Sequence, residues 1–199
     1  MRVLTVLAHP MPESFAAACH RRLAEALGAA GHEVRSLDLN AMGFDPVMRE
    51  GERRGYFAAR GADLPPDVAE QLAHLRWAEG VVFVYPTWWY SLPAMLKGWL
   101  DRVFVPEETF TLGTRLNPIV GRLTNIRLIG GISTYGSPRW WISLVARDPG
   151  RRVIMLGLKP LCARGCRTFW LGLYDMDRVT AERRRAFLDE VGRLAARIE

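Results

Sequence analysis

The sequence predicts a doubly wound α/β fold: a five-stranded parallel sheet, in the order 2-1-3-4-5, with helices on both faces. Strand-like and helix-like segments alternate along the whole chain, as they do in sheets built with right-handed helical crossovers. The strand-like runs are continuously apolar, which is typical of strands buried on both faces. The 199 residues accommodate five strand–helix pairs, whereas an eight-stranded barrel needs about 250 residues. We therefore expect one domain over residues 1–199.

The first two strands and the helix between them follow from local patterns. Residues 2–8 are a short β-branched run closed by a His-Pro turn, which is typical of a buried strand. Ser14 can cap a helix over 15–30, which is rich in alanine and leucine and ends among glycines. Residues 33–39 predict the second strand.

The middle of the chain predicts a third strand between two helices. Residues 49–66 are polar, contain glycines and end in two prolines, so we expect a surface excursion there. A helix is expected over 67–79, and residues 80–86 are the most strand-like run of the chain. Pro93 stands where proline favours a helix start, and apolar positions follow at helical spacing over 94–103.

The last third predicts two more strands and two more helices. Residues 126–132 form another buried-strand run. A helix is expected over 139–158, bounded or broken near the Pro-Gly pair at 149–150. A final strand over 167–174 precedes an amphipathic helix that Thr180 can cap.

Composition limits the possible functions. The chain has 27 lysines and arginines against 21 acidic residues, and nearly all of the cations are arginines. Arginine pairs with phosphate in a bidentate way, so a phosphorylated cofactor, a nucleic acid or solubility alone would fit this charge. No apolar run approaches the roughly 18 residues of a membrane span. The N-terminal segment fits a first strand better than a signal peptide, so we expect a cytoplasmic protein without membrane insertion.

Neither a metal centre nor a nucleophilic triad is indicated. The three cysteines include no Cys-x-x-Cys pair, and Cys162 and Cys166 are more simply explained as packing residues. All four histidines lie within the first 74 residues, without a carboxylate cluster at metal-ligand spacing. We therefore expect no metal, and instead a cofactor that carries its own chemistry.

The first of three unusual loops follows the first strand, at the end where ligands of open parallel sheets bind. It lacks the Gly-x-Gly-x-x-Gly fingerprint of dinucleotide sites. It offers instead the hydroxyl of Ser14 and the free amides of Phe15 and Ala16 at a helix N-terminus, which can hold a phosphate. His9 could add a donor. A plain helix cap is the competing interpretation.

The second loop places three aromatic residues in succession, Trp88, Trp89 and Tyr90. A core does not need adjacent aromatics in a loop, whereas a flat heteroaromatic ligand needs stacking area and an apolar wall. The amides from Thr87 to Tyr90 could bond the nitrogens and carbonyls of such a ring. A dimer-interface patch is the alternative, and the two roles are compatible.

The third loop, from Gly130 to Gly136, has the small residues of a phosphate loop without its chemistry. Ser137-Pro138 stand where a Walker A loop requires Lys-Ser/Thr, and proline cannot donate a hydrogen bond. Small residues and hydroxyls allow an extended ring system to approach closely. Tyr135, Trp140 and Trp141 could cover its outer face.

Two of these segments resemble a known family. They are Ala8-His9-Pro10 with Ser14-Phe15, and the stretch from Phe83 to Phe104, which contains Pro-Thr-Trp-Trp-Tyr-Ser-Leu-Pro-Ala-Met-Leu-Lys-Gly-Trp. Both are similar to the flavodoxin-like NAD(P)H:quinone oxidoreductases. This family includes NAD(P)H dehydrogenases (quinone) of animals and bacteria and the ancillary flavoproteins of potassium-efflux systems. The resemblance implies a flavodoxin-like fold, and the order of the elements agrees over most of the chain.

The resemblance also implies a flavin site with three parts. The phosphates and ribityl chain would be seated by His9, Ser14, Phe15 and Ala16; the isoalloxazine ring would be lined by Pro86, Thr87, Trp88, Trp89 and Tyr90 and, by a looser match, by Ser133, Thr134, Tyr135 and Gly136. Trp89 and Tyr135 are the residues expected to act in catalysis. Arg184 and Met176 fall where longer members contact the adenosine of FAD. FAD is expected because the Ser14-Phe15 pair resembles the FAD-using members more closely, with FMN as the alternative.

The resemblance further implies a homodimer, which Lys97-Gly98-Trp99 and Asp101-Arg102 would help to build. There are two departures from the family. Tyr135 replaces a glycine, which would narrow the pocket. The tyrosine–histidine pair of the long animal enzymes cannot be carried over, because no histidine follows His74.

The expected activity is a flavin-dependent NAD(P)H:quinone oxidoreductase. Two electrons would pass by ping-pong hydride transfer from NAD(P)H, through the flavin, to a quinone-like acceptor. The alternative is a regulatory flavoprotein subunit of a membrane transporter of the potassium-efflux type, with incidental reductase activity. Nucleic-acid binding is disfavoured, because no lysine–arginine cluster or reading helix stands out.

Overall fold

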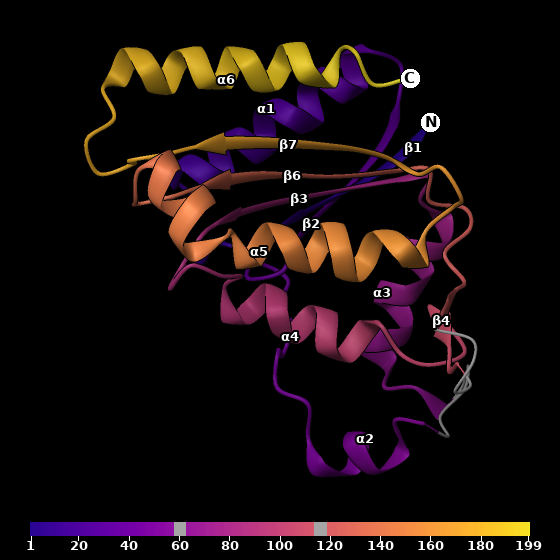
Figure 1. The fold of residues 1–199 in the computed structure, drawn as a ribbon. Helices are drawn as coiled ribbons and strands as arrows, with labels where there is room; N and C mark the ends of the chain where they lie inside the picture. Colours follow the sequence, from indigo (N-terminus) through magenta and orange to yellow (C-terminus); the bar gives the residue numbers. More distant parts are fainter. Residues whose placement is uncertain (58–62, 114–118) are drawn as a thin grey trace.

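The computed structural model describes residues 1–57, 63–113 and 119–199, with one parallel sheet at its centre (Figure 1). The sheet strands are β1 (Arg2–Leu7), β2 (Glu33–Asp38), β3 (Gly80–Pro86), β6 (Leu128–Thr134) and β7 (Arg167–Leu173). They lie in the order β2-β1-β3-β6-β7, and every neighbouring pair is parallel. Counted along the chain this is the predicted order 2-1-3-4-5, so the predicted fold class is confirmed.

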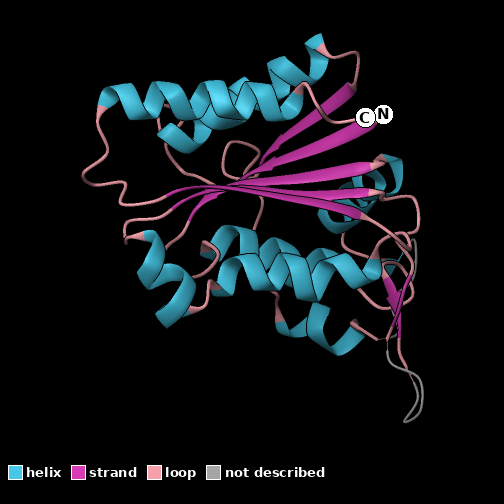
Figure 2. Ribbon diagram, turned by 45° about the horizontal axis from the view of Figure 1, so that its top comes forward, coloured by secondary structure: helices cyan, strands magenta, loops and turns pink. Residues whose placement is uncertain are grey.

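Helices cover both faces of the sheet (Figure 2). One face carries α1 (Phe15–Ala29) and α6 (Ala181–Ala195), and the other carries α3 (Pro66–Trp77), α4 (Ala94–Val103) and α5 (Pro149–Arg152). The central strand β3 contributes to both layers, because its side chains alternate in direction. Val82 and Val84 join the core under α1 and α6, whereas Phe83 and Tyr85 join the opposite core. Among the described residues, no helix has the length and apolar character of a membrane span.

The two predicted helix caps are confirmed. Ser14 Oγ accepts a hydrogen bond from the amide of Ala17, 3.2 Å away, and Thr180 Oγ1 accepts one from the amide of Arg183 at 3.2 Å. Each hydroxyl satisfies an amide that the start of a helix leaves without a partner. The bounds of the sheet strands and of α1, α3 and α4 agree with the sequence pattern to within two residues.

The helix predicted over 139–158 is broken close to the predicted place. Two π-helical segments, η2 (Trp141–Ala146) and η3 (Val153–Leu158), flank α5. Between η2 and α5, Arg147 and Asp148 have left-handed φ angles of 58° and 45°. Proline disfavours helical backbone in the residue before it, so Pro149 explains why the chain leaves the helix here. The Asp148 side chain then caps α5 by accepting from the Arg151 amide at 3.3 Å.

Four short elements have no counterpart among the sequence predictions. The helix α2 (Glu50–Gly55) lies in the excursion expected over 49–66, of which residues 58–62 are outside the described part of the chain. The strands β4 (Phe110–Thr111) and β5 (Val120–Gly121) form an antiparallel ribbon, and the 3₁₀ turn η4 (Lys159–Leu161) follows η3. Elements this short do not show a periodic hydrophobic pattern.

Part of the expected dimer surface is instead buried inside the chain. Trp99 has no exposed surface, and its indole donates to a glutamine side chain of α3 at 3.1 Å. Arg102 is also buried and donates to carboxylates of α2 and α3. Gly98 lies so close to a neighbouring loop that a Cβ would collide with its backbone. These three residues therefore hold α4 within its own subunit, and only Lys97 and Asp101 are exposed, paired with each other.

Candidate functional site

The three unusual loops lie at one edge of the sheet. They follow β1, β3 and β6, which are neighbours in the sheet and run in the same direction. In Figure 1 this edge is on the left, where the arrowheads of β6 and β7 end and α6 begins. Ligands of open parallel sheets bind beyond the carboxyl ends of the strands. The fold therefore brings the predicted loops to a place that suits a ligand.

The first loop prepares a helix N-terminus for an anion. The hydroxyl of Ser14 is occupied by the amide of Ala17, so the amides of Phe15 and Ala16 are those with no carbonyl one turn earlier. Such amides form the positive end of the helix dipole and suit a phosphate. The ring of Phe15 lies 6.1 Å from the ring of Phe187 in α6. Its side chain thus serves packing, and its amide is the group that a ligand can use.

His9 adds a donor beside this terminus. Its Nδ1 accepts a hydrogen bond from the amide of Met11 at 3.0 Å, so the proton of the neutral ring is on Nε2. Burial lowers the pKa of His9, against the opposing effects of the Met11 hydrogen bond and of the carboxylates of Glu13 and Asp38. The imidazole ring is 5.6 Å from the ring of Trp88. His9 therefore joins the phosphate seat to the aromatic loop.

The aromatic loop is a tight turn with two left-handed residues at its tip. The backbones of Trp88 and Ser91 bond each other reciprocally, with N···O distances of 3.2 and 3.1 Å. Trp89 and Tyr90 between them have φ angles of 49° and 62°, where glycine, asparagine and aspartate dominate. For a bulky residue this conformation costs about 1–2 kcal/mol. Trp89 is 96% exposed, so packing within the described chain does not explain the strain.

The second and third loops are tied together by backbone and hydroxyl groups. The Thr87 amide donates to the Thr134 carbonyl at 2.7 Å, and the hydroxyls of Thr87 and Ser133 are 3.0 Å apart. The Trp88 amide closes the aromatic turn, so two of the amides expected to bond a ring are already used. Ser133 and Thr134 are buried. Among the described residues, the amides of the two left-handed positions are the ones in this loop that are left for a ligand.

Tyr135 points into the protein. It is 1% exposed; its hydroxyl donates to Asp148 Oδ2 and accepts from Trp170 Nε1, both at 2.9 Å. Its ring stacks on Tyr174 with 4.6 Å between the centroids, and burial raises the pKa of both Tyr135 and Asp148. This geometry does not fit the catalytic and ring-covering roles predicted for the Tyr135 side chain. The cause is its buried hydrogen-bond network, which the sequence pattern does not reveal.

A cavity of about 230 Å³ opens between the aromatic turn and the start of η2. Its lining residues are Thr87, Trp89, Tyr90, Gly136, Ser137 and Ile142. Four of them were predicted, whereas Ser137 and Ile142 were not assigned to the site. The sequence feature that could have pointed to Ile142 is its position directly after Trp140 and Trp141, in the helix expected over 139–158. Gly136, Ser137 and Ile142 thus line the cavity together with residues of the exposed aromatic turn.

The two residues assigned to the adenosine end differ in placement. The amide of Met176 donates to the carbonyl of Tyr135 at 2.9 Å, so Met176 lies beside the third loop. Arg184 is exposed in the first turn of α6, which begins at the same edge of the sheet (Figure 1). It does not line the cavity.

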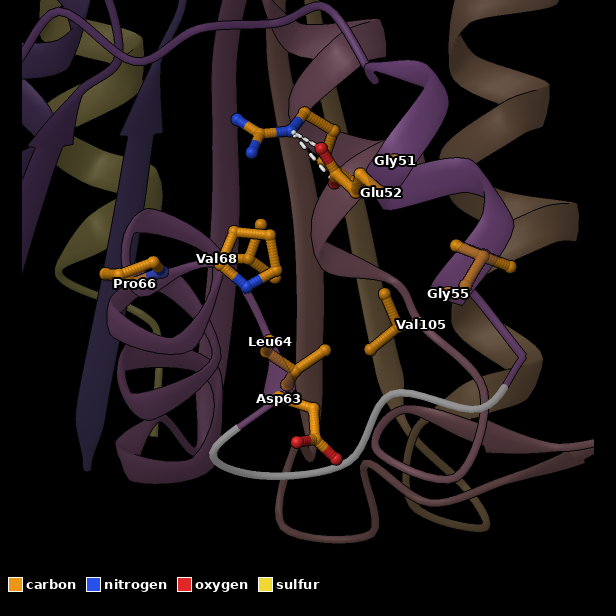
Figure 3. Close-up of a pocket in the computed structure, with 11 residues that line it drawn as sticks. Gly51, Glu52, Gly55, Asp63, Leu64, Pro66, Val68 and Val105 are labelled. Carbon is orange, nitrogen blue, oxygen red and sulfur yellow. Dashed lines mark hydrogen bonds and ion pairs between the residues drawn. The ribbon is translucent and has the colours of Figure 1, made fainter.

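A larger cavity, of about 420 Å³, lies on the α2 side of the molecule (Figure 3). None of the residues predicted to bind a cofactor lines it. Arg102 is among the lining residues, and its guanidinium donates to Glu52, to Asp67 and to the Asp45 carbonyl. Across the described residues, no cluster of histidine, cysteine and carboxylate side chains could hold a metal. The smaller cavity is therefore the candidate site.

A parallel doubly wound sheet, a helix N-terminus suited to phosphate and an exposed aromatic turn at the same edge define a class of protein. It consists of α/β proteins that bind flat, phosphate-bearing ligands at the ends of their strands. The chain belongs to the flavodoxin-like fold family, whose model matches residues 1–143. The resemblance noted in the sequence is thereby confirmed.

Relatives of known name agree with this resemblance. The chain is 38% identical over 117 residues to the ribosyldihydronicotinamide dehydrogenase-like protein traD of Penicillium crustosum, covering 52% of this chain and 44% of that protein. It is 33% identical over 150 residues to NAD(P)H dehydrogenase [quinone] 1 of Rattus norvegicus, covering 68% and 54%. The matches span about half the length of these relatives.

Solved structures extend the likeness to the whole chain. Smu.1420 from Streptococcus mutans UA159 superposes with a TM-score of 0.86 at 27% identity, with all of both chains covered. An NAD(P)H:quinone oxidoreductase from Methanothermobacter marburgensis superposes with a TM-score of 0.80 at 25% identity, covering 100% of this chain and 99% of that one. The region after residue 143 thus has a structural counterpart as well.

Proposed function

We propose that this protein is a flavin-dependent NAD(P)H:quinone oxidoreductase. The observation that carries the proposal is the aromatic turn Trp88–Ser91 beside the N-terminus of α1. Two residues of the turn have a strained, left-handed backbone, and its aromatic rings are held in solvent. The turn lies next to the amides at the start of α1, which suit a phosphate. A flat ring system with a phosphate tail accounts for both features. The names of the rat relative and of the M. marburgensis structure support the reaction class.

The phosphate seat fits a flavin. The amides of Phe15 and Ala16 would hold the phosphate, and the Nε2 proton of His9 would add a third donor. Ser14 would act indirectly, because its hydroxyl holds the amide of Ala17 and so keeps the first turn in shape. The neutral state of His9 makes it a hydrogen-bond donor without a full positive charge.

The ring seat fits as well. Trp88 would stack beside the ring system, and the amides of Trp89 and Tyr90 would bond its polar edge. Ser137 and Ile142 face the aromatic turn across the cavity and would exclude water from one side. Bound there, a flavin supplies a centre that accepts a hydride and passes two electrons on. Among the described residues that line the cavity, Tyr90 has the only ionisable side chain.

A ping-pong order is part of the proposal. The cavity of about 230 Å³ is below the usual range of ligand pockets, about 300–1,000 Å³, so a donor and an acceptor would not fit beside the flavin together. We infer that the nicotinamide of NAD(P)H and the quinone-like acceptor occupy the same place in turn, each aligned by Trp89 and Ile142.

The flavin itself is either FAD or FMN. The resemblance of the Ser14-Phe15 pair to FAD-using members favours FAD. The comparisons favour FMN, because an FMN-dependent NADH-azoreductase from Bacillus anthracis, in complex with FMN, superposes with a TM-score of 0.76 at 17% identity. Mass spectrometry of the molecule released on heating decides between the two.

The proposed function is tested on the purified, flavin-loaded protein. A flavin absorption spectrum that bleaches anaerobically with NADH or NADPH and returns on addition of a quinone is the expected result. A protein that stays colourless after incubation with both FAD and FMN would contradict the proposal. If dithionite bleaches the spectrum but neither NADH nor NADPH does, the protein binds a flavin but NAD(P)H is not its reductant.

Two further expectations stay predictions. The regulatory role in a transporter of the potassium-efflux type has no specific support in the structure, and a pull-down with and without NADH would test it. A cytoplasmic location would be tested by fractionation of cells.

A homodimer is also proposed, on a different surface from the one that the resemblance implied. Trp140, Leu144 and Val145 are exposed in and next to η2, which contributes Ile142 to the cavity lining, and a second copy would cover them. Light scattering at micromolar concentration is expected to give twice the chain mass. The Leu144→Glu variant is expected to give the single-chain mass, and a monomeric wild type would contradict the proposal.

A further inference from the structure

A second groove runs along the same helical segment as the cavity. It has a volume of about 320 Å³ and is lined by Ser143, Arg147, Asp148, Arg151, Arg152, Met155 and Leu156. The two hollows are adjacent in the chain, because Ile142 lines the first and Ser143 lines the second. The left-handed residues at 147 and 148 and the start of α5 at Pro149 bring the three arginines to one groove.

The groove is strongly cationic. Arg147, Arg151 and Arg152 are exposed, and no ion pair among the described residues involves Arg147 or Arg152. Arg151 lies over the ring of Trp170, 5.8 Å from its centroid. The one carboxylate in the lining, Asp148, is buried and bonded by the Tyr135 hydroxyl and the Arg151 amide. Three guanidinium groups therefore face a ligand with little competition from acidic groups.

We infer that this groove binds the 2′-phosphate and adenosine of NADPH and makes NADPH the preferred reductant. The inference rests on the proposed function. Guanidinium groups pair with phosphate in a bidentate way and stack on flat heteroaromatic rings. The apolar side chains of Met155 and Leu156 suit the adenine face. With the nicotinamide in the first cavity, the nucleotide would run along η2 to the arginines.

NADH differs from NADPH by the one group that these arginines recognise. The preference is therefore carried by a dianionic phosphomonoester, and a dinucleotide without it loses the charge-assisted contacts. Removing such contacts is expected to cost about tenfold or more in affinity. The ring seat at Trp88–Ser91 is untouched by this difference, so the reaction with NADH should persist.

Direct binding tests the groove apart from the reaction. By calorimetry on the flavin-loaded protein, 2′,5′-ADP is expected to bind at least tenfold more tightly than 5′-AMP. The variant Arg147→Asn/Arg152→Ala is expected to abolish that difference; asparagine tolerates the left-handed conformation at 147. Arg193→Ala in α6 is the control, because it also removes an exposed arginine and should keep the difference. Equal binding of the two nucleotides by the wild type would overturn the inference, as would an unchanged difference in the double variant.

Steady-state kinetics separates the two proposals. The wild type is expected to show a kcat/KM at least tenfold higher with NADPH than with NADH, and the double variant is expected to lose this NADPH advantage. Equal kcat/KM values for both nucleotides would overturn the groove and leave the reductase standing. Turnover with neither nucleotide would overturn the proposed function, while the calorimetry still decides whether the groove takes a 2′-phosphate. If the double variant does not fold, the wild-type comparison of 2′,5′-ADP with 5′-AMP decides alone.

Discussion

The second and third loops stand on neighbouring strands, yet the protein uses them in opposite ways. The turn Trp88–Ser91 holds its aromatic side chains toward solvent at the expense of two left-handed residues. The third loop turns Tyr135 inward, where its hydroxyl has both a donor and an acceptor partner. The first arrangement costs stability and exposes aromatic rings, whereas the second adds stability and buries the Tyr135 ring. The third loop contributes Gly136 to the cavity lining, so its side of the cavity carries no aromatic ring.

Replacing Tyr135 by alanine should have the largest effect. The change removes a buried ring and leaves the Asp148 carboxylate and the Trp170 indole without their partner, so a loss of about 3–5 kcal/mol in unfolding free energy is expected. Urea denaturation measures it. Tyr90→Ala, at a 39% exposed position of the aromatic turn, is the matched control and should change stability by less than about 1 kcal/mol. Equal losses in the two variants would mean that the two loops do not differ as described.

Replacing Trp88 by alanine should weaken flavin binding and leave stability nearly intact. The side chain is 45% exposed, so a loss of roughly 1–2 kcal/mol in flavin binding is expected, a factor of about ten in the dissociation constant. Fluorescence titration of the flavin-free protein measures it, with Leu112→Ala, at another exposed apolar residue away from the cavity, as control. A variant that purifies fully yellow with unchanged turnover would rule out stacking on Trp88.

Replacing Trp89 by glycine should stabilise the protein. Glycine adopts the left-handed conformation without a Cβ clash, and its greater freedom in the unfolded chain offsets part of that gain, so an increase of about 0.5–1 kcal/mol is expected. Turnover should fall at the same time, because the ring that aligns donor and acceptor is lost. Trp89→Ala keeps the strain and should lose turnover without the gain. A glycine variant less stable than the alanine variant would show that the turn is not strained.

The smallest effect expected is a pH dependence of stability from the histidines whose pKa burial lowers, which are His9, His20 and His74. Burial lowers the pKa of His9 and of His20, whose Nε2 is 2.9 Å from the Thr5 hydroxyl. Below the unfolded value of about 6.5 the unfolded chain takes up protons that the folded chain refuses, so stability decreases as the pH falls and levels off above that value. His20→Gln should flatten this slope more than His9→Gln, because His20 is the more buried. Thermal melts between pH 5 and 8 test this, and a slope of opposite sign would contradict it.

The order of the strands and helices could be predicted because each element has a local sequence pattern, such as an apolar run or a capping side chain. The run at 80–86 is apolar throughout since β3 is covered on both faces, and Ser14 and Thr180 mark helix starts by their own side-chain chemistry. The loops at the strand ends follow from topology alone once the strands are placed. For the same reason the sequence could place His9 and Trp88 at the same edge of the sheet, where their rings lie 5.6 Å apart.

The direction of side chains within those loops could not be predicted. Tyr135 is buried because Asp148, thirteen residues later, and Trp170 on the next strand meet its hydroxyl, and such distant partners leave no periodic signal. The same holds for Arg102, whose carboxylate partners lie on α2 and α3. The resemblance placed Trp99 at a subunit contact, whereas the hydrogen bond to Gln71 keeps it inside.

Asp148 takes part both in the buried hydrogen bonds of Tyr135 and in the lining of the arginine groove. One carboxylate oxygen holds Tyr135, whose backbone bonds Met176 and Leu173 around the third loop, while the same residue lines the arginine groove. A nucleotide phosphate that pairs with Arg151 would change the charge around this carboxylate. The strength of the hydrogen bond from the Tyr135 hydroxyl to Asp148 would change with it. Because Asp148 joins the groove to the buried hydrogen bonds of Tyr135, binding in the groove would also act on the third loop.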